Sequence, residues 1–107
     1  MVIEIGYSDS VQHPCIFKDK NLQVFIEDSP IGWMVHCYIK NWTISCYKRL
    51  LDLLVITLNK APNKELYCVS NNKKLTKFSE MFGFEDIDTI HDSKGNEIGV
   101  LMKCVIL

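Results

Sequence analysis

The chain has 107 residues, of which 48% are hydrophobic and 23% are charged, a balance that excludes a disordered chain or a collagen-like repeat. The 12 basic and 13 acidic side chains leave a formal net charge of −1, which excludes the broadly basic surface of a typical nucleic-acid-binding protein. The length is that of one domain, so we expect residues 1–107 to share a single core.

We expect a cytoplasmic protein without a membrane partner. Glu4 and Asp9 interrupt the N-terminal stretch, so the pattern of a secretory signal peptide is missing. The longest apolar runs are far shorter than the roughly 20 residues that span a bilayer. Arg49 is the single arginine, which argues against a surface that recognises nucleic-acid phosphates or guanines.

The five cysteines are predicted to be small core residues, and no metal site is expected. They are scattered without any C-x-x-C pair. His36 and Cys37 are neighbours, but successive residues of a strand point to opposite faces and do not share one metal. The cysteines are Cys15, Cys37, Cys46, Cys68 and Cys104.

The first predicted elements are two strands joined by a turn. Residues 1–20 show no clear pattern, although residues 1–6 have the composition of a short strand. Apolar and polar residues alternate over 21–27, which is the period of a half-buried strand. Residues 28–31 supply turn chemistry, and the nearly continuous apolar run over 32–39 predicts a central strand covered on both faces.

A helix and a further strand follow. The helix is predicted to run to about residue 60, with Asn41 or Thr43 as its N-cap, and residues 65–69 form the next strand. A strand, a helix and a strand in this order predict a βαβ unit with parallel strands. The apolar stripe of the helix comprises Ile44, Tyr47, Leu51, Leu54 and Leu58.

The last predicted elements are a second helix and a hairpin. The helix begins after Asn72, presents Leu75, Phe78 and Phe82 on one face, and stops at Gly83. Strands over 84–90 and 98–106 then pair across a turn at 92–96. The predicted fold class is therefore α/β (α+β), with a mixed, mostly antiparallel sheet and two main helices.

The segment from Asn72 to Phe84 resembles the late helix of the GNAT N-acetyltransferases. In that family an asparagine opens the helix and a Gly-Phe pair, here Gly83-Phe84, closes it eleven residues later. The order strand, strand, helix, strand, helix, hairpin over 21–106 is also similar, and small phage-encoded proteins with a reduced GNAT-like domain resemble it best. The resemblance implies a single reduced GNAT-like domain, with acetyl-CoA as the cofactor of any catalytic activity.

The family's coenzyme A loop is missing. GNAT enzymes hold the pyrophosphate with an R/Q-x-x-G-x-G/A loop, in which glycines allow close backbone approach before a helix N-terminus. The corresponding positions are Trp42, Ser45 and Tyr47, which supply neither the arginine nor the glycines. The amides near Ser45 and Cys46 are nevertheless candidate anion ligands if the helix starts there.

Two further residues are conditional coenzyme A ligands. Asn72 matches the asparagine that lies close to coenzyme A in the family, and it is equally suited to be an ordinary N-cap. Lys73 places a positive charge beside the same helix N-terminus, where it favours a phosphate.

The catalytic candidates are weak. Ser79 falls where the family has its tyrosine general acid, and a serine hydroxyl is far less acidic. Glu27 and His36 are the nearest candidates for a general base on the early strands, although a solvated carboxylate and a structural histidine explain them as well. Cys37 acts as a nucleophile only if a basic neighbour lowers its pKa.

Three functions fit these observations, and we favour the first. The chain is a degenerate GNAT-like protein that acts through protein binding, with the acidic stretch at 85–92 or the aromatic residues Trp33, Trp42 and Tyr47 at the contact. Alternatively, it is an acetyl-CoA-dependent N-acetyltransferase. A second alternative is a virion component that forms homo-oligomers through an exposed strand at 98–106. The expected location is accordingly the host cytoplasm or the virion.

Overall fold

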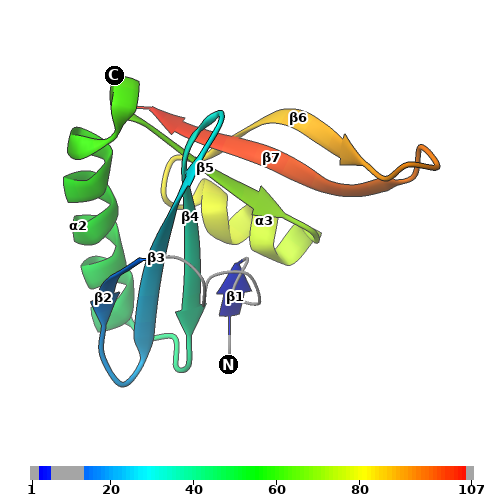
Figure 1. The fold of residues 1–107 in the computed structure, drawn as a ribbon. Helices are drawn as coiled ribbons and strands as arrows, with labels where there is room; N and C mark the ends of the chain where they lie inside the picture. The colour runs from blue at the N-terminus through cyan, green and yellow to red at the C-terminus, as the bar shows by residue number, and fades with distance from the viewer. Residues whose placement is uncertain (1–2, 6–13, 106–107) are drawn as a thin grey trace.

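The computed structural model describes residues 3–5 and 14–105, which form a mixed α+β structure (Figure 1). A short 3-10 helix, η1 (Pro62–Lys64), separates the longer helix from the strand that follows it. The helices are α2 (Ile44–Lys60) and α3 (Lys73–Glu80). The strands are β1 (Ile3–Ile5), β2 (Cys15–Lys18), β3 (Leu22–Ser29), β4 (Gly32–Ile39), β5 (Glu65–Ser70), β6 (Glu85–His91) and β7 (Glu97–Val105).

The described strands form one seven-stranded sheet. Six of them follow in the order β2-β3-β4-β5-β7-β6, and β1 pairs with the end of β4. The β4–β5 pairing is parallel, as the βαβ prediction requires, and every other pairing is antiparallel. The parallel pairing is short: Trp33 and Met34 of β4 face Leu66 and Tyr67 of β5. Beyond these residues β4 pairs with β1, so β4 and β5 separate at their carboxyl ends.

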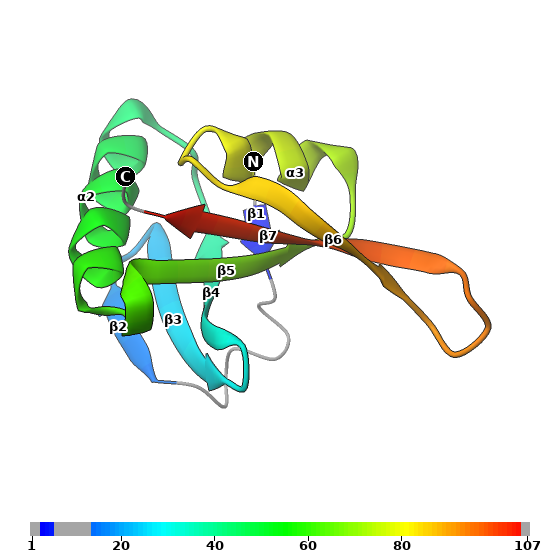
Figure 2. The same cartoon turned by 90° about the horizontal axis from the view of Figure 1, so that it is seen from above.

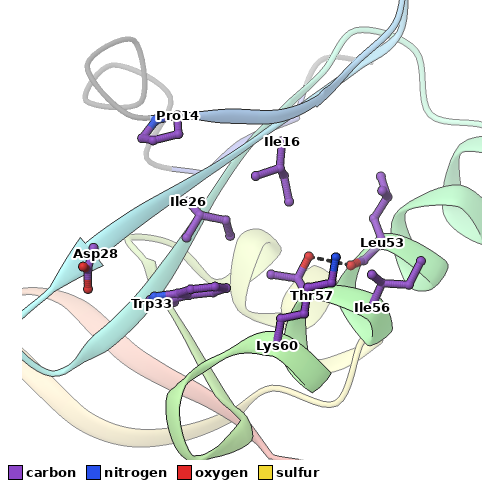
Figure 3. A pocket seen from close by; sticks show the side chains of 9 residues that line it. All are labelled: Pro14, Ile16, Ile26, Asp28, Trp33, Leu53, Ile56, Thr57 and Lys60. Carbon is purple, nitrogen blue, oxygen red and sulfur yellow. Dashed lines mark hydrogen bonds between the residues drawn. The ribbon is translucent and has the colours of Figure 1, made fainter.

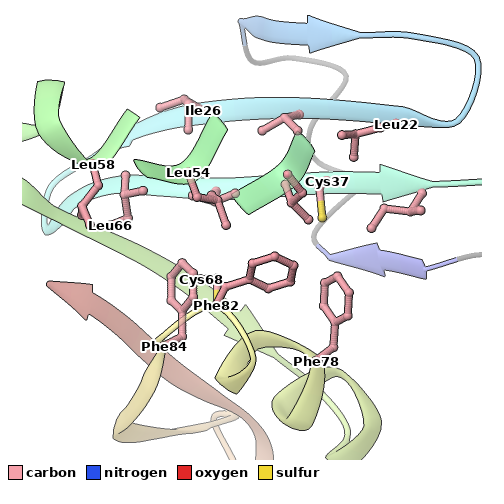
Figure 4. Close-up of a cluster of buried hydrophobic side chains, with 14 of the residues drawn as sticks. Leu22, Ile26, Cys37, Leu54, Leu58, Leu66, Cys68, Phe78, Phe82 and Phe84 are labelled. Carbon is pink, nitrogen blue, oxygen red and sulfur yellow. The ribbon is translucent and has the colours of Figure 1, made fainter. Parts of the chain in front are cut away.

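Both helices contribute to one core on the same face of the sheet (Figure 4). Alternate residues of β3 and β4 point towards α2, because side chains of a strand alternate between its faces. Aromatic residues of α3 and of the turn after it cover β5 and β7 on this face. The core members include Val24, Ile26, Val35, Cys37, Leu50, Leu54, Leu66, Cys68, Phe78, Phe82 and Met102.

The predicted positions of the elements are confirmed from residue 21 to the end of the described chain, whereas the predicted apolar stripe of α2 is confirmed only in part. Leu54 and Leu58 are buried as predicted. Ile44 is 77% exposed, and Tyr47 and Leu51 are only half-buried. The side of α2 that faces the core also includes residues that the predicted stripe omitted, so the helix is rotated slightly relative to the prediction. The buried residues of α2 are Cys46, Leu50, Leu54, Thr57 and Leu58.

The final hairpin is also confirmed, but its outer strand is not the one that we expected. The strand predicted over 98–106 is β7, which lies between β5 and β6, so it has no free edge for a partner; Ile106 lies outside the described residues. The edge strand is β6, and bulges near Asp86 and His91 interrupt its register. Bulges and acidic residues are devices that protect sheet edges from pairing. The hairpin tip projects beyond the other strands (Figure 2).

The N-terminal segment contains a strand that no pattern predicted. Residues 15–18 form β2, which pairs with β3 through a bulged register. The short strand expected at residues 1–6 is present as β1 over residues 3–5, and the rest of that range lies outside the described residues. Neither of the described helices has the length and hydropathy needed to cross a membrane.

Candidate functional site

An apolar groove of about 440 Å³ lies between the β2–β3 pair and the C-terminal half of α2 (Figure 3). This volume falls within the range of roughly 300–1,000 Å³ that is typical of binding pockets. Trp33, from the start of β4, lies between the sheet wall and the helix wall. The groove is lined by Pro14, Ile16, Ile26, Asp28, Trp33, Leu53, Ile56, Thr57 and Lys60.

The side chains of the two walls are spaced as expected for residues that share one face of a strand or one side of a helix. Ile26 and Asp28 are two residues apart on β3 and therefore lie on one face of the sheet. The helix wall uses positions spaced by three and four residues along α2, which share one side of a helix. Its polar member, Thr57, donates its hydroxyl to the carbonyl of Leu53 at 2.7 Å, so that wall exposes little unpaired polarity.

The rim of the groove combines exposed apolar side chains with one charge of each sign. Ile16 is 42% exposed and Ile56 is 52% exposed. Asp28 and Lys60 are both exposed, and no other described residue forms an ion pair with either of them. A concave apolar surface with a charged rim is suited to holding an apolar side chain or small ligand, with the charges selecting its orientation.

A salt bridge fastens β2 and the following turn to α2 at the other end of the helix. Arg49 donates to the carboxylate of Asp19 at 2.5 Å, and its guanidinium lies 5.7 Å from the centre of the Phe17 ring. Asp19 also accepts the backbone N–H groups of Asn21 and Leu22, each at 2.8 Å. This arrangement ties the turn between β2 and β3 to the first half of α2.

We expect the contribution of Asp19 to stability to depend on pH. The Asn21 amide, followed by the Leu22 amide and Arg49, holds the pKa of Asp19 below its ordinary value of 3.8. Its contribution is therefore complete above that ordinary value and is lost as the pH falls through the lower, folded-state pKa. Urea unfolding between about pH 6 and pH 2 checks this: relative to Asp19→Asn, the native protein should lose stability at the acid end. A pH-independent difference between the two proteins would contradict it.

A second region of interest is the crevice between the carboxyl ends of β4 and β5. Parallel strands that separate at their carboxyl ends commonly leave a ligand crevice, and the N-termini of α2 and α3 both lie at this end of the sheet. Here the crevice is filled, and a cavity of only about 20 Å³ remains, which is room for one water molecule. Its walls include Cys37, Cys68, Phe78 and Phe82 (Figure 4).

The filling is an aromatic cluster formed by Trp42, Tyr47, Phe78 and Phe82. Trp42 meets Phe78 edge-on with 5.1 Å between ring centres, and it lies 6.0 Å from Tyr47 and 6.4 Å from Phe82. Phe78 and Phe82 are 5.2 Å apart. Trp42 and Tyr47, two of the predicted interaction residues, are thus half-buried parts of the core packing. Of the predicted aromatic anchors, Trp33 is the one that lines an open groove.

Of the conditional coenzyme A ligands, Asn72 is a helix cap and the Cys46 amide is bonded to one. Thr43, one of the two predicted caps, accepts the N–H of Cys46 at 3.0 Å, so the expectation of a bare amide at Cys46 is wrong. Ser45 is exposed in the first turn of α2. Asn72 accepts the N–H of Leu75 at 2.9 Å, which is the role of an ordinary N-cap. Both helix starts are therefore already stabilised by the chain's own side chains.

A polar recess of about 350 Å³ lies at the start of α3, and Asn72 and Lys73 line it. Lys73 is exposed there, but Glu97 of β7 lines the same recess and repels anions. Lys73 attracts a phosphate and Glu97 repels it, so their effects on phosphate binding largely cancel. The recess is therefore a weaker site than the groove.

The two candidate bases form one pair on the sheet face opposite α2. His36 is buried, and its Nε2 lies 2.9 Å from the Glu27 carboxylate. Neither residue lines the groove, the crevice or the recess described above. The pair provides a partner for Nε2 of a buried imidazole, which agrees with the structural interpretation of His36. Among the described residues, no three histidine, cysteine or acidic side chains gather in a way that would hold a metal ion.

The other reactive candidates are buried. Ser79 is only 3% exposed, and the Cys68 thiol donates to its hydroxyl at 3.7 Å. Burial raises the pKa of Cys37 to about 12, which is the opposite of what a nucleophilic thiol needs. Cys46 and Cys68 are buried as predicted, whereas Cys104 is half-buried and Cys15 is exposed.

No protein-family model, curated protein or solved structure matches this chain.

Proposed function

We propose that this chain is a reduced, catalytically degenerate GNAT-like protein that acts by binding another protein chain. The order of elements from β3 to β7 is the order on which the resemblance rests, which supports the proposed relationship. The parallel β4–β5 pair with a helix after each strand further supports it. A scaffold of this kind keeps its architecture when its chemistry is lost, because function lies in the site and not in the fold.

One observation supports the proposed loss of catalytic activity. The aromatic cluster occupies the space between the separating ends of β4 and β5. A coenzyme that entered there would have to displace Phe78 and Phe82, which are 9% and 7% exposed. The Cys46 amide, a candidate for its pyrophosphate, already bonds to Thr43. Binding would therefore require repacking of the core, which costs several kcal/mol.

The groove supports the second part of the proposal, that the chain binds another protein. It is open and mostly apolar, and the indole ring of Trp33 lines it, whereas the crevice is closed. Tryptophan is among the residues that contribute most to protein interfaces, especially where a surrounding pocket excludes water. An apolar side chain of a partner protein is the occupant that this shape and chemistry favour.

Calorimetric titration with acetyl-CoA and with free coenzyme A tests the loss of cofactor binding. We expect no heat of binding up to millimolar ligand, because neither the space nor the phosphate ligands are present. An active N-acetyltransferase titrated under the same conditions provides the positive control. Micromolar affinity for either ligand would overturn the proposal and support the acetyltransferase function instead.

A further inference from the structure

The helix wall of the groove carries its own protruding apolar side chains. Ile56 lines the groove and is nevertheless 52% exposed, and its neighbour Val55 is 49% exposed. Isolated exposed apolar residues are common, but Ile56 is exposed and also lines an apolar concavity. One surface therefore presents both a cavity and a side chain of the kind that would fill it.

The charges at the rim are also self-complementary. Asp28 lies on the β3 wall and Lys60 lies on the α2 wall, on opposite sides of Trp33 (Figure 3). In a two-fold dimer whose axis runs along the groove, the β3 wall of one copy faces the α2 wall of the other. Every contact across such an interface occurs twice, once in each direction. Each copy can then place its lysine against the partner's aspartate. A net charge of −1 leaves little overall repulsion between copies.

We propose that the groove binds a second copy of this chain in a two-fold symmetric dimer. Ile56 of each protomer enters the partner's groove beside Trp33, and Lys60 pairs with the partner's Asp28. This inference rests on the proposed protein-binding function and names its partner.

Sedimentation equilibrium of the whole chain measures the association directly. We expect a dimer whose dissociation constant rises about 100-fold or more in Ile56→Gln, because each lost apolar contact occurs twice in a two-fold interface. The matched control is Ile44→Gln, which changes the same residue type on the same helix at a site that is 77% exposed and does not line the groove. The control should dimerise like the native protein. Circular dichroism should show that both variants are folded.

Exchange of the rim charges identifies the pairing. Asp28→Lys alone and Lys60→Glu alone each place like charges across the interface, so each variant should be monomeric at concentrations where the native protein is dimeric. A mixture of the two single variants should form a heterodimer, because every facing pair is then of opposite sign. The double variant, with both replacements, should form a homodimer again.

A native protein that is monomeric up to millimolar concentration would overturn the dimer, as would a dimer that Ile56→Gln does not weaken. Failure of the mixed single variants to associate would overturn the Lys60–Asp28 pairing. None of these outcomes affects the titrations with coenzyme A, which test the loss of cofactor binding separately. If the protein neither dimerises nor binds coenzyme A, the dimer is wrong, but the proposed protein-binding function still stands, with a partner of different sequence.

Discussion

Replacement of Phe78 by alanine is expected to lower the free energy of unfolding by about 3–5 kcal/mol, the usual cost of removing a buried phenylalanine. Phe78 is 9% exposed, and its ring contacts both Trp42 and Phe82. These neighbours belong to different segments, so they cannot collapse into the space without moving the start of α2 towards α3. Urea unfolding monitored by tryptophan fluorescence measures the change.

Met81→Ala is the matched control for this substitution. Met81 is the residue that caps α3 and is 51% exposed, so its replacement should change the free energy of unfolding by only about 0.5 kcal/mol. A loss below about 1.5 kcal/mol in Phe78→Ala would show that the aromatic cluster is not part of the core. It would also remove the reason for regarding the crevice as closed.

Phe78→Ala also tests whether the aromatic cluster by itself prevents coenzyme A from binding. Removal of the ring enlarges a cavity that now measures about 20 Å³. We expect Phe78→Ala to bind no more coenzyme A than the native chain, because the residues before and within the first turn of α2 form no glycine-rich phosphate loop and because Thr43 already bonds to the Cys46 amide. Affinity gained in Phe78→Ala would mean that the rest of the site is intact.

Local patterns predicted most of the fold because the later elements depend on short-range signals. The alternation in β3, the caps Thr43 and Asn72, and the glycine after α3 each act within a few residues of the boundary that they specify. Burial on α2 was harder to predict. Cys46 was expected in the core as a cysteine, but the helical stripe omitted it. Thr57 is a weak hydrophobic signal and is nevertheless buried, because its hydroxyl donates to a backbone carbonyl.

The groove was not predictable, because its walls come from segments distant in the sequence. Pro14 and Ile16 belong to the stretch that showed no pattern, and they meet Ile56 only through the pairing of β2 with β3. Trp33 was identified as an interaction residue from its type alone. The filling of the crevice was not predictable either. It depends on the contact between Trp42 and Phe82, and the spacing of residues within α3 does not reveal a contact with a residue that precedes α2.

Gly32→Ala is the second substitution with a large expected effect, and we estimate a loss of about 2–4 kcal/mol. Gly32 has φ +140°, a conformation that side chains rarely adopt. An added Cβ would also lie 2.8 Å from Cε2 of Tyr67 on β5. That ring cannot easily move, because its hydroxyl donates to Glu65 at 2.5 Å and Lys103 holds the same carboxylate at 3.1 Å.

Gly95→Ala separates the two causes of this loss. Gly95 also has a positive φ, of +85°, but no atom lies within 4 Å of the position that its Cβ would take, so only a backbone cost of about 1 kcal/mol is expected. In a Tyr67→Ala background the cost of Gly32→Ala should fall towards that value, since the steric part of the loss is a coupling between the two residues. Equal losses for Gly32→Ala in the native and Tyr67→Ala backgrounds would assign the whole effect to the backbone. The hairpin that carries Asp28 and Trp33 would then owe its position to its own turn and not to its contact with β5.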